Sequence, residues 1–311
     1  MQEVTWDEPA PGRLLVRVAA CGVGLPDLLM VQGTYPLTPT PPVQPGQEVV
    51  GTVVAAGAGT RFVVGDRVMG LTPFQEGLGG FGEYAYVRDS KTVVAPPTLS
   101  DAEAAGFMIG FRTAYAALVC RVAVENGQTV AVLGGSGSSG LAAIRLAKTL
   151  GARVIAIGSV PEKIEHCAGA GADDGISHRD GDVGERLLEL TDGVGVDVLF
   201  DPVGGAVAAQ AVNGVRTRGS IAVIGFASGS WLKPAMGDVV LRNLAVVGVF
   251  AGGFTVDEDT AMNSSLQAMA ERGELRPSLG EAFEFDDVAE VLHVLDQGVP
   301  PGKITVRVDT G

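Results

Sequence analysis

The stretch that decides the fold is Thr129-Val-Ala-Val-Leu133 followed by Gly134-Gly-Ser-Gly-Ser-Ser-Gly140. Its first five residues are apolar or β-branched, which is typical of a strand buried in a parallel sheet. Gly135, Gly137 and Gly140 have the spacing G-x-G-x-x-G. In this motif the first glycine turns the chain, the middle one lets a pyrophosphate approach the backbone, and the last lets helix and strand pack closely. The stretch therefore predicts a dinucleotide site.

The residues on the C-terminal side support this prediction. Leu141–Leu150 form an apolar-faced helix and Gly151–Ile157 a second strand, so that the glycine loop lies inside a βαβ unit. The N-terminus of such a helix presents free N–H groups and the positive end of its dipole, which favour a bound anion. We expect the loop to contact the cofactor through Gly135, Ser136, Gly137, Ser138, Ser139 and Gly140.

The middle of the chain alternates strands with helices. Strands are predicted at 129–133, 153–157, 174–177, 196–200, 220–224 and 244–249. Six strands with intervening helices fit a doubly wound parallel sheet.

The first hundred residues have a different sequence pattern from the middle of the chain. Short β-like runs separated by Gly and Pro turns indicate a mostly antiparallel, barrel-like domain. These runs are Leu14–Ala19, Val49–Ala56, Arg67–Leu71, Glu83–Val87 and Thr92–Ala95. Ser100-Asp-Ala-Glu103 then has the pattern of a capping box that opens a helix.

The end of the chain returns to the first domain in this interpretation. Helices are predicted near 257–272 and 286–297, followed by a closing strand at Ile304–Val308. The domain prediction is 1–105 for the first part of the catalytic domain, 106–250 for the cofactor domain, and 251–311 for the return. The cofactor domain is thus an insertion.

Composition narrows the possible partners. The 311 residues carry a net charge of −14 and the pI is about 4.6, which argues against nucleic acid or an anionic membrane as the main partner. No apolar run reaches the ~18 residues that a membrane span needs, and Met1–Glu8 lacks the features of a signal peptide. Three widely spaced cysteines imply no disulfide framework. We expect a reduced, cytoplasmic protein.

A set of short motifs spaced along the chain carries a family resemblance. They are Ala20-Cys21-Gly22-Val23, Pro26-Asp27, Gly33-Thr34-Tyr35-Pro36, Pro45-Gly46-Gln47-Glu48, Gly65-Asp66-Arg67-Val68, Gly80-Phe81-Gly82-Glu83-Tyr84, Thr113-Ala114-Tyr115, the glycine loop, Gly195-Val196-Asp197 and Asp201-Pro202-Val203-Gly204-Gly205. With these motifs the chain resembles the zinc-independent medium-chain dehydrogenase/reductase superfamily, in the branch of quinone oxidoreductases (zeta-crystallin-like) and enoyl reductases. The resemblance implies an α/β fold in which a Rossmann doubly wound parallel sheet is inserted into a GroES-like, mostly-β catalytic domain, with a cleft between the two.

The same resemblance bears on metal binding. Zinc alcohol dehydrogenases of the superfamily place a Cys ligand at the position of Gly24 and a His ligand at that of Gln47, and quinone reductases commonly have Asn at position 24. Glycine and glutamine do not supply the thiolate and imidazole ligands that zinc prefers, and the three Cys and three His of the chain are scattered singly. We therefore predict no metal, and a conjugated acceptor rather than a simple alcohol.

The residues after the second strand of the βαβ unit bear on the choice of nicotinamide. An NAD site usually has Asp or Glu there to bind the ribose 2′-hydroxyl, but the strand ends Ile157-Gly-Ser-Val160. Glu162 follows a proline and is interpreted as a first-turn helix residue. The side chains placed to meet a 2′-phosphate are Ser159, Lys163, His178 and Arg179, of which Lys163 and His178 are assigned from the resemblance. The pattern favours NADPH.

Candidates for the chemistry come mostly from the resemblance. Tyr35 matches a tyrosine that lines the substrate site and can hydrogen-bond an enolate oxygen; the alternative is that it packs beside Pro36. Asp27 and Glu48 match family positions, where a structural role behind the site is favoured. The remaining residues expected at the cofactor are Thr113, Phe226, Phe250, Gly252 and Lys303.

These observations predict an NADPH-dependent, zinc-free reductase that delivers hydride to quinones or α,β-unsaturated carbonyl compounds, with a small apolar carbonyl compound or quinone as the acceptor. The alternatives are an enoyl-thioester reductase of fatty-acid or polyketide metabolism and a non-catalytic, crystallin-like NADPH-binding protein. Leu244–Phe250 is an apolar run without charge at the predicted sheet edge. Because such edges are normally paired or covered, a homodimer is expected.

Overall fold

The structure is a computed structural model that describes residues 5–298 and 300–308. The chain divides into two compact units. Within the described residues, the first comprises 5–109, 255–298 and 303–308. The second comprises Gly110–Phe254 and Pro300–Gly302. Each unit is described separately.

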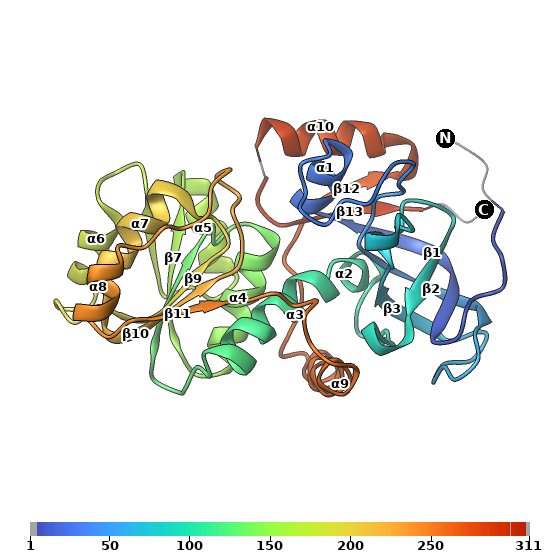
Figure 1. The fold of residues 1–311 in the computed structure, drawn as a ribbon, viewed down its shortest axis with the longest axis horizontal. Helices are drawn as coiled ribbons and strands as arrows, with labels where there is room; N and C mark the ends of the chain where they lie inside the picture. The colour runs from blue at the N-terminus through green and yellow to red at the C-terminus, as the bar shows by residue number, and fades with distance from the viewer. Residues whose placement is uncertain (1–4, 299, 309–311) are drawn as a thin grey trace. The chain divides into compact units, whose positions relative to one another are not determined.

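The second unit is built on a six-stranded sheet with the order β11-β10-β9-β6-β7-β8 (Figure 1). The strands are β6 (Thr129–Leu133), β7 (Arg153–Gly158), β8 (Asp174–Ser177), β9 (Val196–Asp201), β10 (Val215–Val223) and β11 (Ala245–Gly248). All neighbouring pairs are parallel. From β6 the chain adds two strands on one side and then crosses over to add three on the other. This order confirms the doubly wound sheet that the sequence predicts.

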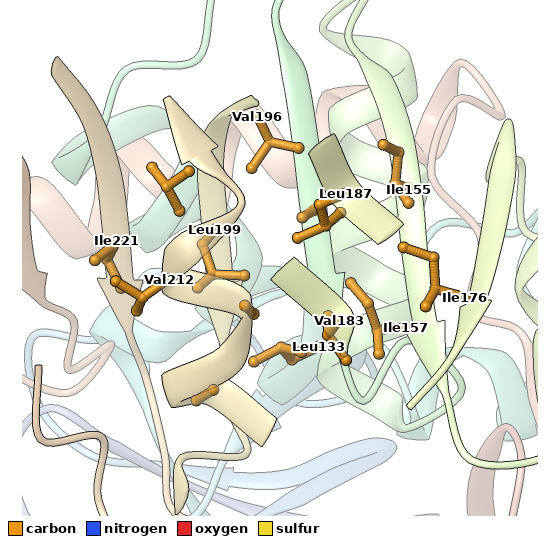
Figure 2. Close-up of a cluster of buried hydrophobic side chains, with 14 of the residues drawn as sticks. Leu133, Ile155, Ile157, Ile176, Val183, Leu187, Val196, Leu199, Val212 and Ile221 are labelled. Carbon is orange, nitrogen blue, oxygen red and sulfur yellow. The ribbon is translucent and has the colours of Figure 1, made fainter. Parts of the chain in front are cut away.

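Helices accompany this sheet, and their apolar faces follow from residue spacing. They are α3 (Met108–Tyr115), which continues into a π-helix (Ala116–Arg121), α4 (Ser138–Thr149), α5 (Pro161–Gly169), α6 (Val183–Leu190), α7 (Gly205–Asn213) and α8 (Met236–Leu241). Val183 and Leu187 are four residues apart on α6 and both are fully buried, since positions i and i+4 share one face. Figure 2 shows them over Leu133, Ile155 and neighbouring strand residues, in one apolar cluster.

The first unit is built on a seven-stranded, mostly antiparallel sheet, as predicted. Its order is β12-β13-β1-β2-β3-β5, and β4 also pairs with β1. The strands are β1 (Arg13–Val23), β2 (Glu48–Ala56), β3 (Arg67–Leu71), β4 (Tyr84–Arg88), β5 (Thr92–Val94), β12 (Leu279–Glu284) and β13 (Lys303–Arg307). Leu14, Val16 and Val18 alternate along β1 and are fully buried, as the period of a strand requires. β1 is long enough to pair with β2, β4 and β13.

The α-helices in the described part of this unit are α1 (Leu25–Val31), α2 (Asp101–Ala105), α9 (Val256–Glu271) and α10 (Val288–Gln297). The predicted capping box is present at α2, where Ser100 Oγ accepts a hydrogen bond from Glu103 N at 3.3 Å. β12 was not predicted. Its sequence, Leu-Gly-Glu-Ala-Phe-Glu, contains two glutamates and a glycine and lies partly exposed at the sheet edge, so it has no continuous apolar pattern. Within residues 5–298 and 300–308, no helix combines the length and apolar character needed to cross a membrane.

Candidate functional site

The glycine loop connects β6 to α4. Gly134 has a φ of +57 and is the left-handed residue of the turn. The backbone conformation that favours glycine therefore occurs one residue before the first glycine of the motif. Gly137 is the N-cap of α4 and adopts an extended conformation. The free N–H groups of the first turn of α4 therefore begin at Ser138, where an anion would meet them.

The glycines of the motif differ in what surrounds them. A Cβ added to Gly135 would lie 2.9 Å from Cys167 Sγ, and one added to Gly140 would lie 2.3 Å from the Gly134 carbonyl oxygen. Packing therefore requires both glycines. A Cβ added to Gly137 would meet only the Gly134 oxygen, at 3.4 Å. The middle glycine thus leaves an open approach to the backbone, which is the arrangement that a pyrophosphate needs.

Solvent exposure follows the same division along the loop. Gly135, Ser136 and Gly140 are buried, whereas Ser138 and Ser139 remain partly exposed at the start of α4. The Ser136 carbonyl accepts a hydrogen bond from Gly302 N at 3.0 Å. The accessible part of the loop is therefore the helix N-terminus.

The residues predicted to meet a 2′-phosphate are brought to one edge of the sheet. Gly158 at the end of β7 pairs with Ser177 at the end of β8, and His178 N donates a hydrogen bond to the Gly158 carbonyl at 3.0 Å. Ser159 directly follows Gly158, and Arg179 lies two residues after Ser177. Arg179 is exposed, and its side chain makes no ion pair within the part of the chain that the structure describes.

Lys163 and Glu162 lie just beyond this edge, in the first turn of α5. Lys163 is half-buried, whereas Glu162 is exposed. The side chain of Glu162 is thus a first-turn acid, in agreement with its sequence interpretation.

The aromatic residues predicted near the nicotinamide follow two paired strands. Val223 of β10 is in register with Gly248 of β11, and Phe226 and Phe250 come just after them. The Phe226 ring lies 4.7 Å from that of Trp231, centroid to centroid; sequence reasoning did not identify Trp231. A Cβ added to Gly252 would lie 2.6 Å from the Phe250 ring, so Gly252 provides space for that ring.

Thr113 lies on the face of α3 that packs on the glycine-loop helix. A Cβ added to Gly110 would come within 3.3 Å of the Ser138 carbonyl oxygen. Gly110 and Thr113 are three residues apart, so they share a face of α3.

The first unit contains a buried charge cluster, which we define as Asp27, Glu48 and Lys303. Their exposed fractions are 2%, 1% and 4%. Lys303 Nζ lies 2.6 Å from Glu48 Oε1, and Glu48 Oε2 accepts a hydrogen bond from Ile109 N at 2.8 Å. Lys303, predicted at the cofactor, is thus placed in an ion pair with Glu48.

Asp27 fixes two backbone segments. Its Oδ2 accepts a hydrogen bond from Gly24 N and its Oδ1 one from Gly46 N, both at 2.9 Å. Burial raises the pKa of Asp27 to about 6, against the opposing effects of the Lys303 ammonium and these two donors. These contacts give Asp27 the structural role that the sequence interpretation favoured.

Tyr35 follows α1 and is half-buried. Burial raises the pKa of its hydroxyl, and the nearby Gln47 side chain acts in the opposite direction. Gln47 itself is 4% exposed. Among the described residues its Nε2 has no hydrogen-bond partner, so the residue at the position of a zinc-ligand His in relatives is a buried amide.

Comparisons with known proteins agree with this geometry. Residues 10–97 match the alcohol dehydrogenase GroES-like domain, and residues 140–271 match the family described as zinc-binding dehydrogenase. Quinone oxidoreductase-like protein 2 of Bos taurus is 30% identical over 313 residues, which cover 99% of this chain and 88% of the relative.

Solved structures give the same result. A quinone oxidoreductase of Pseudomonas syringae superposes with a TM-score of 0.88 at 28% identity, covering 98% of this chain and 94% of that one. A mycobacterial protein solved in complex with NADPH has a TM-score of 0.87 at 27% identity, with 98% and 94% coverage. The chain belongs to the medium-chain dehydrogenase/reductase superfamily, in its quinone oxidoreductase-like branch. It is therefore an oxidoreductase of a family that uses nicotinamide cofactors.

The different surroundings of Gly137 and Gly140 generate a paired prediction. Gly137→Ala should fold normally and weaken dinucleotide binding about tenfold or more, because its methyl group occupies the approach to the backbone. Gly140→Ala should lower the free energy of unfolding by roughly 1–3 kcal/mol through overpacking. Urea unfolding and NADPH fluorescence titration would measure the two effects. Equal loss of stability in both variants would contradict this division of roles.

The raised pKa of Asp27 generates a prediction on stability. The folded state keeps this proton to a higher pH than the unfolded chain, whose value is near 3.8. Stability from this group is therefore present below about pH 4 and is lost as the pH rises through about 6. From pH 4.5 to 7 the free energy of unfolding should fall by roughly 2 kcal/mol relative to Asp27→Asn. Urea titrations at several pH values test this, and a constant difference would refute it.

Proposed function

We propose that the protein is an NADPH-dependent, zinc-free reductase that delivers hydride to quinones or α,β-unsaturated carbonyl compounds. The observation that carries the proposal is the combination of an open dinucleotide loop at Gly137 with Gly24 and Gln47 at the zinc-ligand positions. The relatives named quinone oxidoreductase support the acceptor class.

The side chains at positions 24 and 47 favour a conjugated acceptor. Neither glycine nor glutamine offers the thiolate or imidazole that binds catalytic zinc. Without a Lewis acid, hydride addition needs an acceptor that is already electrophilic, which quinones and enones are. When bound, the reduced nicotinamide supplies the hydride.

Tyr35 has a direct role in this proposal. Negative charge develops on the acceptor's oxygen as hydride arrives, and a hydrogen bond from the Tyr35 hydroxyl stabilises it.

A substrate panel tests the proposal. Oxidation of NADPH is followed at a single wavelength with 1,4-benzoquinone, cyclohex-2-enone, crotonyl-thioester and a simple aldehyde as acceptors. We expect turnover with the quinone or enone, full activity in the presence of EDTA, and little reduction of the aldehyde. Preference for the thioester would instead assign an enoyl-thioester reductase. Cofactor binding without reduction of any acceptor would assign a non-catalytic, crystallin-like protein.

The edge formed by β7 and β8 supports NADPH over NADH. No carboxylate follows β7 directly, and Ser159, Lys163, His178 and Arg179 gather where the paired strands end. A 2′-phosphate attracts such groups, whereas a free 2′-hydroxyl requires an acid.

This assignment predicts selective effects on cofactor affinity. Arg179→Ala should weaken NADPH by about 1–3 kcal/mol, because a charged hydrogen bond to phosphate is lost, and should leave NADH nearly unchanged. Arg186→Ala is a matched control, since Arg186 pairs with Glu189 on the exposed face of α6. Fluorescence titration with both cofactors measures the affinities. Equal affinity of the unmodified protein for NADPH and NADH would refute the assignment.

We also propose that two copies associate along β11. This strand pairs only with β10 among the described strands, so it forms a sheet edge. Val246 and Phe250 are 41% and 53% exposed there, and Val240 and Leu241 of α8 are 69% and 81% exposed. A second copy that covers this edge would pair its backbone groups and bury the apolar side chains.

A further inference from the structure

Three glycines border the buried charge cluster, and two of them are required by packing. A Cβ added to Gly22 would lie 2.7 Å from Glu48 Oε1 and 2.4 Å from the Ala105 carbonyl oxygen. One added to Gly106 would lie 2.6 Å from Lys303 Cγ. These two glycines therefore provide space for the side chains of Glu48 and Lys303.

Gly24 is different because packing does not require it. Its Cβ would meet Pro26 Cδ at 3.5 Å, Lys303 Nζ at 3.8 Å and Asp27 Oδ2 at 3.9 Å, all of which are ordinary contacts. Its φ of −148 suits any residue. The missing side chain at Gly24 therefore leaves real space, and this space faces the ammonium group of Lys303.

This space is also accessible. Gly24 is partly exposed, whereas Lys303 and Asp27 are at least 96% buried. An ammonium has three N–H donors, and within the described residues its contact with Glu48 is the one ion pair that Lys303 makes. A small polar group that enters beside Gly24 thus reaches a desolvated cation that still has donors to offer.

We propose that the carbonyl oxygen of the acceptor binds beside Gly24 and accepts a hydrogen bond from the Lys303 ammonium. This inference rests on the proposed function and identifies a specificity residue for it. The Lys303 ammonium then supplies, from the chain itself, the positive charge at the acceptor's oxygen.

The chemical balance of the step is simple. When bound, NADPH would supply a hydride to the β-carbon of the enone. The electron pair of the C=C bond then forms the new double bond between the α-carbon and the carbonyl carbon, and the electron pair of the C=O bond moves to the oxygen. The enolate formed is then protonated from water, giving the saturated ketone and NADP⁺. Lys303 keeps its protons throughout and stabilises the charge on oxygen, an effect that is strong in a buried site.

Asp27 and Glu48 do not prevent this role, because their oxygens have partners of their own. Both oxygens of Asp27 accept backbone N–H groups, and one oxygen of Glu48 accepts Ile109 N. Of these four oxygens, only Oε1 of Glu48 pairs with the Lys303 ammonium. The pair with Glu48 holds the ammonium in position at Gly24, since a buried pair of this kind fixes both side chains.

The first test fills the space beside Gly24. Gly24→Ala adds one methyl group without a clash and should fold normally. We expect kcat/KM for cyclohex-2-enone to fall about tenfold or more, with the Kd for NADPH unchanged, because the oxygen loses its place. Gly169→Ala is the matched control, since a Cβ there meets nothing within 4 Å. Equal activity of the two variants would overturn the proposal.

The second test removes the charge but keeps the pair. Lys303→Gln alone would leave Glu48 buried without a counter-charge, so Glu48→Gln is combined with it. We expect a loss of about 10²-fold in kcat for cyclohex-2-enone and a smaller loss for 1,4-benzoquinone, whose ring accepts electrons more readily. A merely structural ion pair predicts no such difference between acceptors, and an equal loss for both would contradict the proposal.

The third test does not depend on turnover. Infrared difference spectroscopy of ¹³C-carbonyl cyclohexanone bound with NADP⁺ should show the C=O band shifted to lower frequency in the unmodified protein. The shift should be lost in Gly24→Ala and in the double variant. A shift without reduction of any acceptor would refute the proposed function and keep the oxygen site. Reduction of enones without a shift, or a shift that persists in both variants, would refute the oxygen site.

Discussion

The close contact between Gly140 of α4 and the backbone of Gly134–Gly135 is the constraint on which the second unit depends. An added Cβ would sit 2.3 Å from a carbonyl oxygen, so helix and loop touch backbone to backbone. This contact brings the N-terminus of α4 to the end of β6 and directs its free N–H groups at the accessible part of the loop. The geometry that would favour an anion here is a consequence of how the βαβ unit packs.

The first unit depends on a buried ion pair. Lys303 and Glu48 come from β13 and β2, which are not neighbours in the sheet but flank β1. Glycine at 22 and 106 gives the two side chains room. Removing one partner of such a pair would leave an uncompensated buried charge. The pair therefore also holds β13 and β2 in place on either side of β1.

The sequence was sufficient for most of the architecture, for definite physical reasons. Parallel strands such as β6 are buried on both faces and are therefore continuous apolar runs, and the glycine spacing shows where the loop lies. β12 escaped prediction because an exposed edge strand needs no such pattern. The site was predicted less completely. Gly22 and Gly106 owe their roles to neighbours distant in sequence, which spacing along the chain does not record. Lys303 was expected at the cofactor, but its burial against Glu48 depends on strand pairing.

The buried charge cluster depends both on which residue stands at a given position and on how distant strands pack together. Position 24 carries no side chain, and this matters only because Lys303 lies behind it, 3.8 Å from where a Cβ would begin. Lys303 in turn reaches that point only because Gly106 lets its stem pass. Substitutions at these positions should therefore act non-additively, since residues in direct contact couple energetically. An asparagine at position 24, as quinone reductases commonly have, would place its side-chain oxygen near the ammonium, where it would compete with the acceptor's oxygen for the same N–H donors. The glycine and the buried lysine are thus best understood as one feature, in which the missing side chain leaves space next to a buried ammonium group.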